Sequence, residues 1–418
     1  MREMKDSGVP WIGKIPLNLK LIRNKYLLSY EKGKKADNTN VEQEGVPYIG
    51  ASDLDSCDIA KLYTTDTALP DVIYDDVLVL WDGARAGLVG TNKVGKLSST
   101  VVKLTPDENV VSKHFLYWYY MAFQQFMYDM VNGTTIPHMN RRFLEDIGFL
   151  SWSLDEQNRI SNYLDTKCTQ IDTIIAKEQS VIEKLQEYNR AIISEAVTKG
   201  INSDRAVIDS GVQWIGRIPN SWKIIKLKYE ADIRRGRFSH RPRNDPDYYD
   251  GKYPFIQTGD ITASRKYITS YTQTLNERGL KVSTSFPKDT ICMSIAANIG
   301  DVAILSFDAC FPDSIVGIGS KKIEINYLYY ALKNMKERLL SVATISTQQN
   351  INVEILKDEF IALPPVDEQK QISNYLDRKS EAIDRIVYQK KYLIDKLNEY
   401  KKSLIYEVVT GKKEVPHG

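Results

Sequence analysis

The feature that most constrains this 418-residue chain is an internal repeat. The phrase SGVPWIGKIP at 7–16 returns as SGVQWIGRIP at 210–219, and DEQNRISNYLD at 155–165 returns as DEQKQISNYLD at 367–377. The offset is 203 residues for the first pair and 212 for the second, so the second copy carries extra residues after its opening phrase. Repeats that recur at several points predict duplicated structural units.

Each copy reads as a mixed globular part followed by one long helix. Segments rich in β-branched residues, such as 75–94 and 288–305, are interrupted by Gly, Asp and Asn, which predicts short strands joined by turns. The fold class is therefore α/β (α+β), with a pseudo-two-fold internal repeat. The predicted parts are a globular domain at 1–154, a long helix at 155–200, a second globular domain at 201–366, a second long helix at 367–411 and a tail at 412–418.

Composition excludes several broad classes of protein. The chain has 56 basic and 54 acidic residues, a net charge of +2, so any DNA affinity must come from local patches. The four cysteines are scattered and lack the spacing of a zinc ribbon or a disulfide framework. No apolar run has the length of a signal peptide or a membrane span. We expect a cytoplasmic protein with reduced thiols and no membrane association.

The two long helical segments carry apolar residues on a heptad grid, which predicts a coiled-coil seam. The grid is interrupted at matching places by Glu178 and Lys390. Polar seam residues lower stability and set register, but parallel and antiparallel pairing would both bring these two together. Two independent amphipathic helices remain the alternative, although a stripe of about 35 residues, or about 50 Å, favours a rigid spacer. The predicted seam comprises Leu164, Ile171, Ile175, Glu178, Ile182, Leu185, Ile192, Leu376, Ile383, Val387, Lys390, Ile394, Leu397 and Leu404.

Several catalytic motifs are approached but incomplete. The segment GTNKVGKL at 90–97 has Leu97 where a phosphate-binding loop needs its magnesium-binding hydroxyl. The double proline in LPPV at 363–366 lacks the polar and aromatic residues that a DNA amino-methyltransferase uses. The four histidines lie far apart, without metal-ligand spacing, and the aromatic run YWYY at 117–120 is predicted to pack in the core. We predict no catalytic residue and no metal site.

The most polarised stretch is RRGRFSHRPR at 234–243, with five arginines and no acid. Arginine pairs with phosphate and forks onto guanine O6 and N7, so this stretch is a candidate for DNA contact. It falls where the second copy carries its extra residues, and sister domains of different specificity are expected to differ there. A solvated basic loop is the alternative.

Two further pairs of segments match in position but differ in their polar residues. Arg85, in a turn between two glycines, corresponds to Asn298 before Gly300, and TTIPHMNRR at 134–142 corresponds to STQQNINVE at 346–354. Arginine suits guanine and asparagine suits adenine. The predicted DNA-binding residues are Arg85, His138, Asn140, Arg141, Arg142, Arg234, Arg235, Arg237, Arg241, Arg243, Asn298, Gln348, Gln349 and Asn350.

Two variable domains alternating with two near-identical long helices resemble the specificity subunit of Type I restriction-modification systems, over essentially the whole chain. The two opening phrases resemble the family's domain-opening phrase, and LPPVDEQKQISNYLD and LSWSLDEQNRISNYLD resemble its helix start; the first copy lacks the double proline. The resemblance implies that 1–154 and 201–366 are target-recognition domains, each reading one half of a bipartite asymmetric site. It also implies that the long helices pair as an antiparallel coiled coil and set the gap between the halves.

The resemblance further implies partners. Two methyltransferase (modification) subunits would carry S-adenosylmethionine and modify adenine in double-stranded DNA, and motor-nuclease (restriction) subunits would add cleavage that depends on ATP and Mg. This chain would bind no cofactor and would be the non-catalytic DNA-specificity subunit. Two other classes remain: a coiled-coil assembly adaptor without sequence-specific DNA binding, and an enzyme acting alone.

Overall fold

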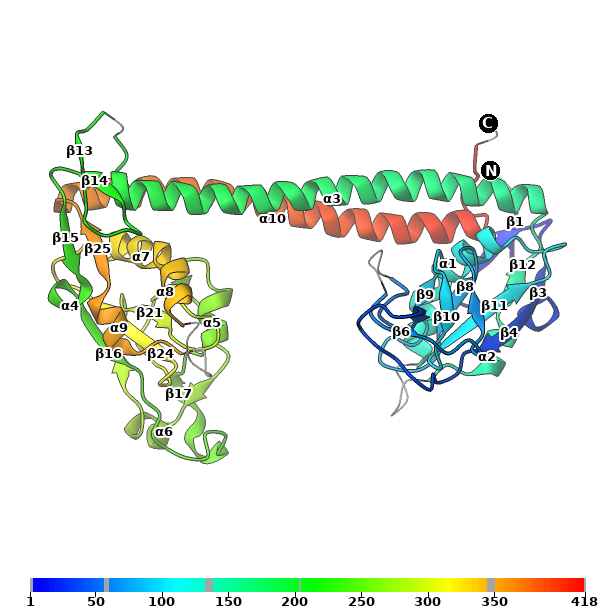
Figure 1. Cartoon of the computed structure of the whole chain (residues 1–418), viewed down its shortest axis with the longest axis horizontal. Coiled ribbons are helices and arrows are strands. Elements are labelled where there is room, and N and C mark those ends of the chain that lie inside the picture. Colours follow the sequence, from blue (N-terminus) through cyan, green and yellow to red (C-terminus); the bar gives the residue numbers. More distant parts are fainter. Residues whose placement is uncertain (1–2, 56–59, 132–137, 203, 344–349, 417–418) are drawn as a thin grey trace. The chain divides into compact units, whose positions relative to one another are not determined.

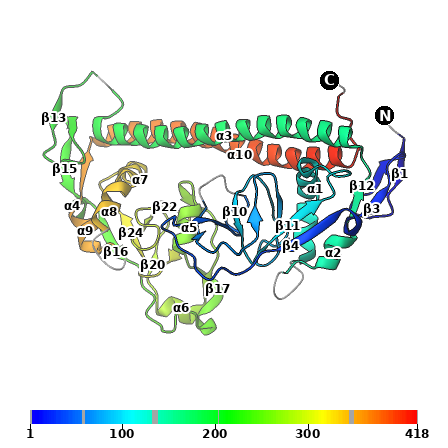
Figure 2. The ribbon, with the colours of Figure 1, turned by 45° about the vertical axis from the view of Figure 1, so that its right-hand side comes forward.

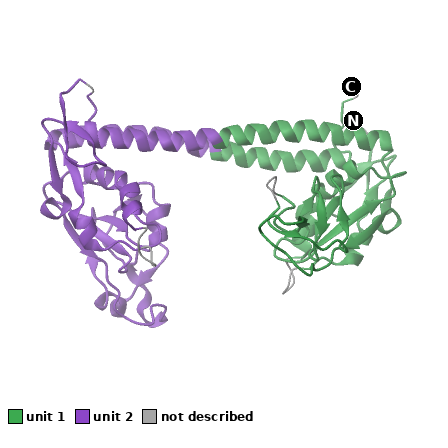
Figure 3. Cartoon of the chain, viewed as in Figure 1, with its two compact units in different colours: residues 1–179, 391–418 green, residues 180–390 purple. Residues whose placement is uncertain are grey.

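A computed structural model of the chain describes residues 3–55, 60–131, 138–202, 204–343 and 350–416. The chain forms two compact units, coloured separately in Figure 3: unit 1 comprises 1–179 and 391–418, and unit 2 comprises 180–390. Both long helices contribute to both units. Helix α3, Leu154–Lys199, gives its first part to unit 1, and helix α10, Val366–Val409, gives its first part to unit 2.

In unit 1 a group of short strands lies beside helix α1, Lys113–Val131 (Figure 1). Its two four-stranded sheets have the orders β6-β5-β10-β7 and β4-β11-β8-β9, and β1–β2 and β3–β12 are two-stranded pairs. Only β10 and β5 pair in parallel among the described strands of this unit. The elements are β1 Met4–Asp6, β2 Lys14–Pro16, β3 Leu21–Arg23, η1 Asn24–Tyr26, β4 Leu28–Lys32, β5 Val46–Ile49, β6 Tyr63–Thr64, β7 Asp71–Val72, β8 Val77–Leu80, β9 Val89–Gly90, β10 Gly95–Leu97, β11 Val101–Pro106, α1 Lys113–Val131, α2 Arg141–Asp146 and β12 Gly148–Leu150.

Unit 2 is built around a five-stranded sheet of order β16-β24-β21-β22-β18, with β13–β14, β15–β25, β17–β19 and β20–β23 as two-stranded pairs. Helix α7 lies beside the N-terminal part of α10 in Figures 1 and 2. The elements are β13 Val207–Asp209, β14 Arg217–Pro219, β15 Lys223–Lys226, α4 Leu227–Glu230, β16 Asp232–Arg235, η2 Pro246–Tyr248, β17 Tyr249–Pro254, α5 Thr258–Ala263, β18 Tyr267–Ile268, β19 Thr274–Leu275, α6 Glu277–Lys281, β20 Ser285–Phe286, β21 Ile291–Ser294, β22 Val302–Leu305, β23 Ala309–Cys310, β24 Ile315–Gly319, α7 Ile325–Asn334, α8 Lys336–Ala343, α9 Val353–Asp358 and β25 Phe360–Leu363.

The two units share one frame, which confirms the predicted duplication. The order β4-β11-β8-β9 in unit 1 matches β16-β24-β21-β22 in unit 2, and β3–β12 matches β15–β25. The stretch between β4 and β8 has 44 residues, whereas the stretch between β16 and β21 has 55. The extra residues therefore lie between β16 and β21, an interval that contains most of the basic stretch and also β18, the fifth strand of the unit 2 sheet.

Each opening phrase folds into the same loop between two paired strands. The backbone N–H of Ser7 donates to Gly13 O at 3.0 Å, and that of Ser210 donates to Gly216 O at 3.0 Å. Both glycines have left-handed backbones, with φ of 65° and 72°, a conformation that a side chain disfavours. The repeated letters therefore encode a specific turn.

The two phrases anchor their domains to the ends of different helices. In unit 1 the phrase packs on the last turns of α10, and in unit 2 the equivalent phrase packs on the last turns of α3. The phrase occurs twice because each domain packs on the end of a different long helix. The buried residues are Ile12 and Ile15 with Leu404, Ile405, Val408 and Val409 in unit 1, and Ile215 and Ile218 with Ile192, Ile193, Ala196 and Val197 in unit 2.

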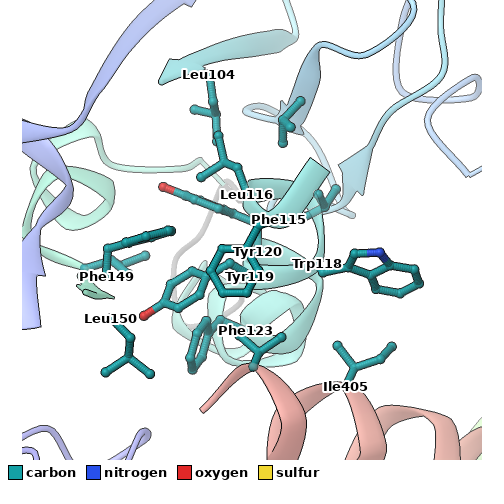
Figure 4. Close-up of a cluster of buried hydrophobic side chains, with 14 of the residues drawn as sticks. Leu104, Phe115, Leu116, Trp118, Tyr119, Tyr120, Phe123, Phe149, Leu150 and Ile405 are labelled. Carbon is teal, nitrogen blue, oxygen red and sulfur yellow. The ribbon is translucent and has the colours of Figure 1, made fainter. Parts of the chain in front are cut away.

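The aromatic run in α1 forms the centre of the unit 1 core. Trp118, Tyr119 and Tyr120 are buried, and Figure 4 shows them with Phe149 of β12 and Ile405 of α10. Each buried aromatic ring removes a large apolar area from water. The prediction that this run packs in the core is confirmed, and the rings are not available for stacking on bases.

The repeated sequence at the start of each long helix ends in an aspartate that grips its own domain. Asp165 accepts a hydrogen bond from Trp118 Nε1 at 2.9 Å, and Asp377 accepts one from the hydroxyl of Tyr330 at 2.6 Å. Both pairs obey the 212-residue offset. Burial, together with the nearby carboxylate, raises the pKa of Tyr330 well above its ordinary value, so the hydroxyl keeps its proton and remains the donor.

A buried glutamine performs a second repeated contact. Gln157 Oε1 accepts from the backbone N–H of Ser112 at 2.9 Å, and Gln369 Oε1 accepts from that of Glu324 at 2.8 Å. Both glutamines are buried, where an unpaired amide would cost about 1–3 kcal/mol. The glutamine of each repeated DEQ therefore fixes the start of a long helix to the residue just before the core helix of the same unit, α1 or α7.

The predicted seam positions are turned inward along both helices, as their burial shows. Each of the predicted positions is buried or half-buried, whereas Ile174, between two of them, is 44% exposed. A buried stripe with spacings of three and four residues is the pattern of a helix that packs on one partner helix. A supercoil that runs the whole length of the helices stays a prediction.

Within each unit the two helices run in opposite directions. In unit 1, Trp152 Nε1, just before α3, donates to Val409 O at 2.9 Å, and twenty residues later Asp172 accepts from Lys401 at 2.6 Å. Residues later in α3 therefore contact residues earlier in α10, so the two helices are antiparallel in this unit. In unit 2, Ser380 donates to Asn189 at 3.0 Å, and a Cβ placed on Gly200, just after α3, would lie 3.3 Å from Oε1 of Glu368 near the start of α10. The antiparallel arrangement that the resemblance implied is thus present within the units.

Candidate nucleic-acid interface

One edge of the main sheet gathers the predicted DNA-reading segments in each unit. In unit 1 this is the edge of the β4-β11-β8-β9 sheet that contains the end of β4, the start of β11 and the end of β8. In unit 2 it is the edge of the five-stranded sheet that contains the end of β16, the start of β24 and the end of β21. Isolated bridges between Asp82 and His138, and between Ala296 and Asn350, attach the loop before α2 or α9. We call these places loop edge 1, comprising 32–35, 81–87 and 138–142, and loop edge 2, comprising 235–243, 295–300, 312–314 and 350–352.

Both loop edges carry a cation, a glycine and a cation at the end of their first strand. These are Lys32, Gly33 and Lys34 in unit 1, and Arg235, Gly236 and Arg237 in unit 2. A Cβ placed on Gly33 would lie 2.1 Å from the carbonyl oxygen of residue 98, and one on Gly236 would lie 2.3 Å from that of residue 312. Only glycine permits two backbones to approach this closely. The two cations that flank each glycine are exposed at the loop edge.

Sequence reasoning missed the lysines of loop edge 1. Lys32, Lys34 and Lys35 are exposed, but Glu31 and Asp37 balance their charge in the sequence, so the segment did not stand out. The signal was nevertheless present, because Lys-Gly-Lys precedes Arg-Gly-Arg by 203 residues, the offset of the opening phrases. Position in the repeat was a better guide here than local charge density.

Arg85 is held at loop edge 1 by its own domain. Its guanidinium donates to the Asp55 carboxylate at 2.6 Å and to Ala51 O at 2.7 Å, and the side chain is half exposed. The correspondence with Asn298 is seen in the backbone, since the glycine that follows each turn donates back to the preceding strand. Asn298 in turn donates to Thr262 Oγ1 at 2.8 Å.

His138 joins the two loops of edge 1. Trp81 Nε1 donates to its Nε2 at 3.3 Å, and its Nδ1 contacts the Asp82 carboxylate. Because an indole N–H is only a donor, Nε2 is the acceptor and Nδ1 carries the proton shared with Asp82. Lys32 Nζ lies 2.9 Å from the same carboxylate. Asp82 is thus the centre of a small charged cluster that sequence analysis did not identify.

Asn140, Arg141 and Arg142, which follow His138 in the sequence, have distinct roles. Asn140 caps α2, since its side-chain oxygen accepts from the backbone N–H of Arg142 at 2.9 Å. Such a cap contributes about 1 kcal/mol. Arg141 pairs with Glu145 at 2.7 Å. Arg142 is exposed, and no ion pair of its side chain occurs among the described residues, so Arg142 is the most available of the three side chains.

Most of the predicted arginines of unit 2 converge on one aspartate. Arg243 Nη2 lies 2.6 and 2.8 Å from the two oxygens of Asp313, and Arg241 lies 3.9 Å from one of them. Arg235 Nε donates to the backbone oxygen of Asp313 at 2.6 Å. Arg237 is exposed at the start of the loop. The sequence suggested a run of unopposed charge, but the fold supplies an acid from a distant segment.

Arg234 differs from the other four arginines. Successive side chains of a strand point to opposite faces, and Arg234 pairs with Asp232 at 3.0 Å while its guanidinium lies 5.3 Å from the centre of the Phe286 ring. It is therefore the weakest candidate of the five for a DNA contact at loop edge 2.

The basic stretch is folded rather than a loosely solvated loop. Phe238 is buried, and His240 stacks on Tyr248 with ring centres 3.8 Å apart. Nε2 of His240 lies 2.8 Å from Asp245. The backbone N–H of Asp247 and then His240 hold the pKa of the Asp245 carboxyl below its ordinary value. These contacts give the arginines defined positions.

Asn350 lies at loop edge 2 through its bridge to Ala296. Gln348 and Gln349, also predicted to contact DNA, lie outside the described residues. Within the described part of the chain, no group of three or more His, Cys, Asp or Glu is placed to hold a metal ion. None of the helices searched there has the length and apolar character that crossing a membrane requires.

Comparison with known proteins agrees with this arrangement. Residues 18–184 and 219–395 each match the family model described as the Type I restriction modification DNA specificity domain. One matched segment lies in each repeated copy, starting near the end of its opening phrase, and each includes part of a long helix.

Similar proteins match over nearly their full length. The chain is 27% identical over 416 residues to the type I restriction enzyme MjaVIII specificity subunit of Methanocaldococcus jannaschii, covering 96% of this chain and 94% of the relative. It is 22% identical to the EcoBI specificity subunit of Escherichia coli, covering 90% and 82%. A chain solved in work on complex assembly and conformational transition of the type I R-M system has a TM-score of 0.73 at 16% identity, covering 96% and 99%. That likeness shows a shared fold.

Proposed function

Because this chain belongs to the family of type I restriction-modification DNA specificity proteins, we propose that its two loop edges each read one half of a bipartite, asymmetric DNA site. The chain is the non-catalytic specificity subunit, and the long helices set the unread gap between the halves. The observation that carries the proposal is the same sheet edge, occupied by different polar side chains, in two copies of one frame.

The chemistry of the loop edges suits a division of labour in DNA recognition. Phosphate contacts position a protein and base contacts specify the sequence. The cation-Gly-cation segments occupy equivalent places and supply charge in both units, as phosphate contacts require. Arg85 and Asn298 occupy equivalent turns but prefer different bases. Two copies with the same positioning groups and different readers would recognise two unlike half-sites.

The long helices offer a surface for partner subunits. Apart from the seam, each helix carries an exposed apolar row with seven-residue spacing, and the two rows match at the 212-residue offset. Exposed apolar surface of this kind is typical of interaction sites. We propose that two methyltransferase subunits dock along these rows and that motor-nuclease subunits join them, with S-adenosylmethionine, ATP and Mg carried by the partners. The rows are Ile174, Val181 and Tyr188 on α3, and Ile386, Leu393 and Tyr400 on α10.

Selection from a random duplex library tests the central proposal. The chain is purified with its methyltransferase subunit, the bound DNA is separated, and the recovered pool is sequenced. We expect a split motif of two short, unlike halves with a constant gap. A well-formed complex that enriches no motif would contradict the proposal and favour the assembly adaptor. Enrichment of only one half would show that one loop edge does not read DNA.

A further inference from the structure

Each loop edge contains one carboxylate that occupies its cations. At loop edge 1 Asp82 holds the ammonium of Lys32 at 2.9 Å and contacts the ring of His138. At loop edge 2 Asp313 holds the guanidinium of Arg243 with both oxygens. The two acids come from different strand ends, since Asp82 follows β8 and Asp313 precedes β24. The two acids do not occupy equivalent positions of the repeat, yet each contacts cations of its own loop edge.

The geometry places the acids inside and the cations outside. The side chains of Asp82 and Asp313 are 35% and 37% exposed, whereas those of Lys32 and Arg243 are 44% and 48% exposed. Nη2 of Arg243 meets both oxygens of Asp313, and the same guanidinium donors bind phosphate or guanine O6 and N7 in protein–DNA contacts. In the free protein the acid therefore takes the place that a DNA group would take.

We propose that Asp82 and Asp313 are specificity-determining residues that suppress binding to non-target DNA at their own half-site. This inference rests on the proposed function and assigns a role to residues outside the predicted contacts. Any DNA that reaches a loop edge brings phosphates toward a carboxylate, and like charges brought together oppose binding. A cation that leaves the acid for a phosphate also gives up its ion pair.

Target DNA can offset this penalty in a way that other DNA cannot. An aspartate accepts hydrogen bonds from the exocyclic amine of cytosine, so a correctly placed base pair in the half-site satisfies the carboxylate once its cation moves to the backbone. A mismatched sequence leaves the carboxylate near phosphate without a donor. The acid therefore lowers the affinity for all DNA but lowers it least for the matching half-site.

The test replaces each acid by its neutral isostere, Asp82→Asn and Asp313→Asn, in the full chain with its methyltransferase subunits. Binding to a mixed-sequence duplex is measured against salt concentration, and library selection is repeated with each variant. We expect affinity for the mixed duplex to rise about twofold to tenfold, with a salt dependence steeper by about 0.9 for each additional phosphate that the freed cations bind. Selection should relax one half of the motif with Asp82→Asn and the other half with Asp313→Asn.

Matched controls are available at equivalent positions of the repeat. Asp146 lies 3.8 Å from Arg23, and Asp358 lies 2.7 Å from Lys228; both acids are exposed, at the last residue of α2 and α9, away from the loop edges. Asp146→Asn and Asp358→Asn should change neither the affinity nor the motif. Thermal unfolding of all four variants verifies that the fold is retained.

The outcomes separate this inference from the function on which it rests. Higher affinity with both halves of the motif intact would overturn the specificity role, as would unchanged affinity and motif. Relaxation of both halves by a single variant would overturn the assignment of each acid to its own half. If the wild-type complex enriches no motif, the proposed function fails and this inference falls with it, a result visible before any variant is made.

Discussion

The two units solve the same packing problem with tryptophans from different segments. Each long helix is followed within two residues by a glycine with a left-handed backbone, Gly200 or Gly411, and an indole ring fills the adjacent space. In unit 2 the ring is that of Trp222, which lies 3.3 Å from the Cβ position of Gly200; in unit 1 it is Trp152, 2.9 Å from that of Gly411. In both units an indole ring fills the space beside the glycine, but the two tryptophans come from different positions of the repeat.

The positions that correspond to these tryptophans hold smaller residues. By the offsets of the repeat, Trp152 corresponds to Pro364 and Trp222 to Leu19. Each indole N–H also has an acceptor, Val409 O at 2.9 Å for Trp152 and the buried carboxylate of Glu368 at 3.1 Å for Trp222. The exchange teaches that two copies of one fold can diverge inside their cores while the anchoring of helix ends is preserved.

The largest expected effect comes from removing these rings. Trp152→Ala and Trp222→Ala should each lower the free energy of unfolding of their own unit by about 3–5 kcal/mol, since each leaves a cavity at a helix end. Hydrogen exchange followed by peptide mass spectrometry reports on each unit separately. Tyr26→Ala and Tyr229→Ala, exposed and equivalent in the repeat, should have little effect. Faster exchange in both units for either tryptophan variant would show that the units are not independently stabilised.

The next effect sharpens the comparison between Asp165 and Asp377. Asp377 accepts from Tyr330 and also pairs with Lys266, whose side chain is only 15% exposed, whereas Asp165 pairs with the more exposed His114. Asp377→Asn should therefore cost about 2–3 kcal/mol and Asp165→Asn about 1 kcal/mol, because the former leaves a cation partly buried without its acid. Denaturant unfolding with hydrogen exchange measures both. Equal costs would mean that Lys266 is compensated by other groups.

A smaller effect is expected at the apolar rows of the helices. Tyr188→Lys and Tyr400→Lys occupy equivalent positions, and each should lower the affinity for the methyltransferase subunit by about tenfold, because a charge replaces an apolar contact. Tyr388→Lys, also exposed but outside the row, is the control. Binding is measured by calorimetry with the purified subunit. If the control weakens binding as much, the row is not the docking surface.

The smallest effect tests whether the two loop edges supply equivalent phosphate contacts. Lys34→Ala and Arg237→Ala should each flatten the salt dependence of DNA binding by about 0.9, the change expected when one phosphate is no longer bound. Arg234→Ala should leave the slope unchanged, because its side chain lies on the other face of β16. A salt series of binding isotherms on one duplex distinguishes these results. A slope change only in unit 2 would break the equivalence of the two edges.

Much of the fold was readable from the sequence because local patterns record local burial. The heptad grid predicted which face of α3 and α10 turns inward, and the apolar neighbours of the run at 117–120 predicted its place in the core. The repeat predicted two copies of one frame and where the second copy would be longer. The DNA-contact residues remain predictions, although the structure brings Arg85, His138 and Arg142 to one edge.

What the tertiary structure alone decided concerns residues that are remote in sequence. Strand order and register bring Asp313 to the arginines of 235–243 and Lys32 to Asp82, and no local pattern contains that information. The same holds for the helix end that each opening phrase grips, which lies at the far end of the chain for unit 1. The sequence by itself determined the duplication, the inward faces and the turns, because these depend on short-range periodicity and backbone conformation. The charge balance at each loop edge was decided by long-range pairing, because only the folded sheet sets which side chains become neighbours.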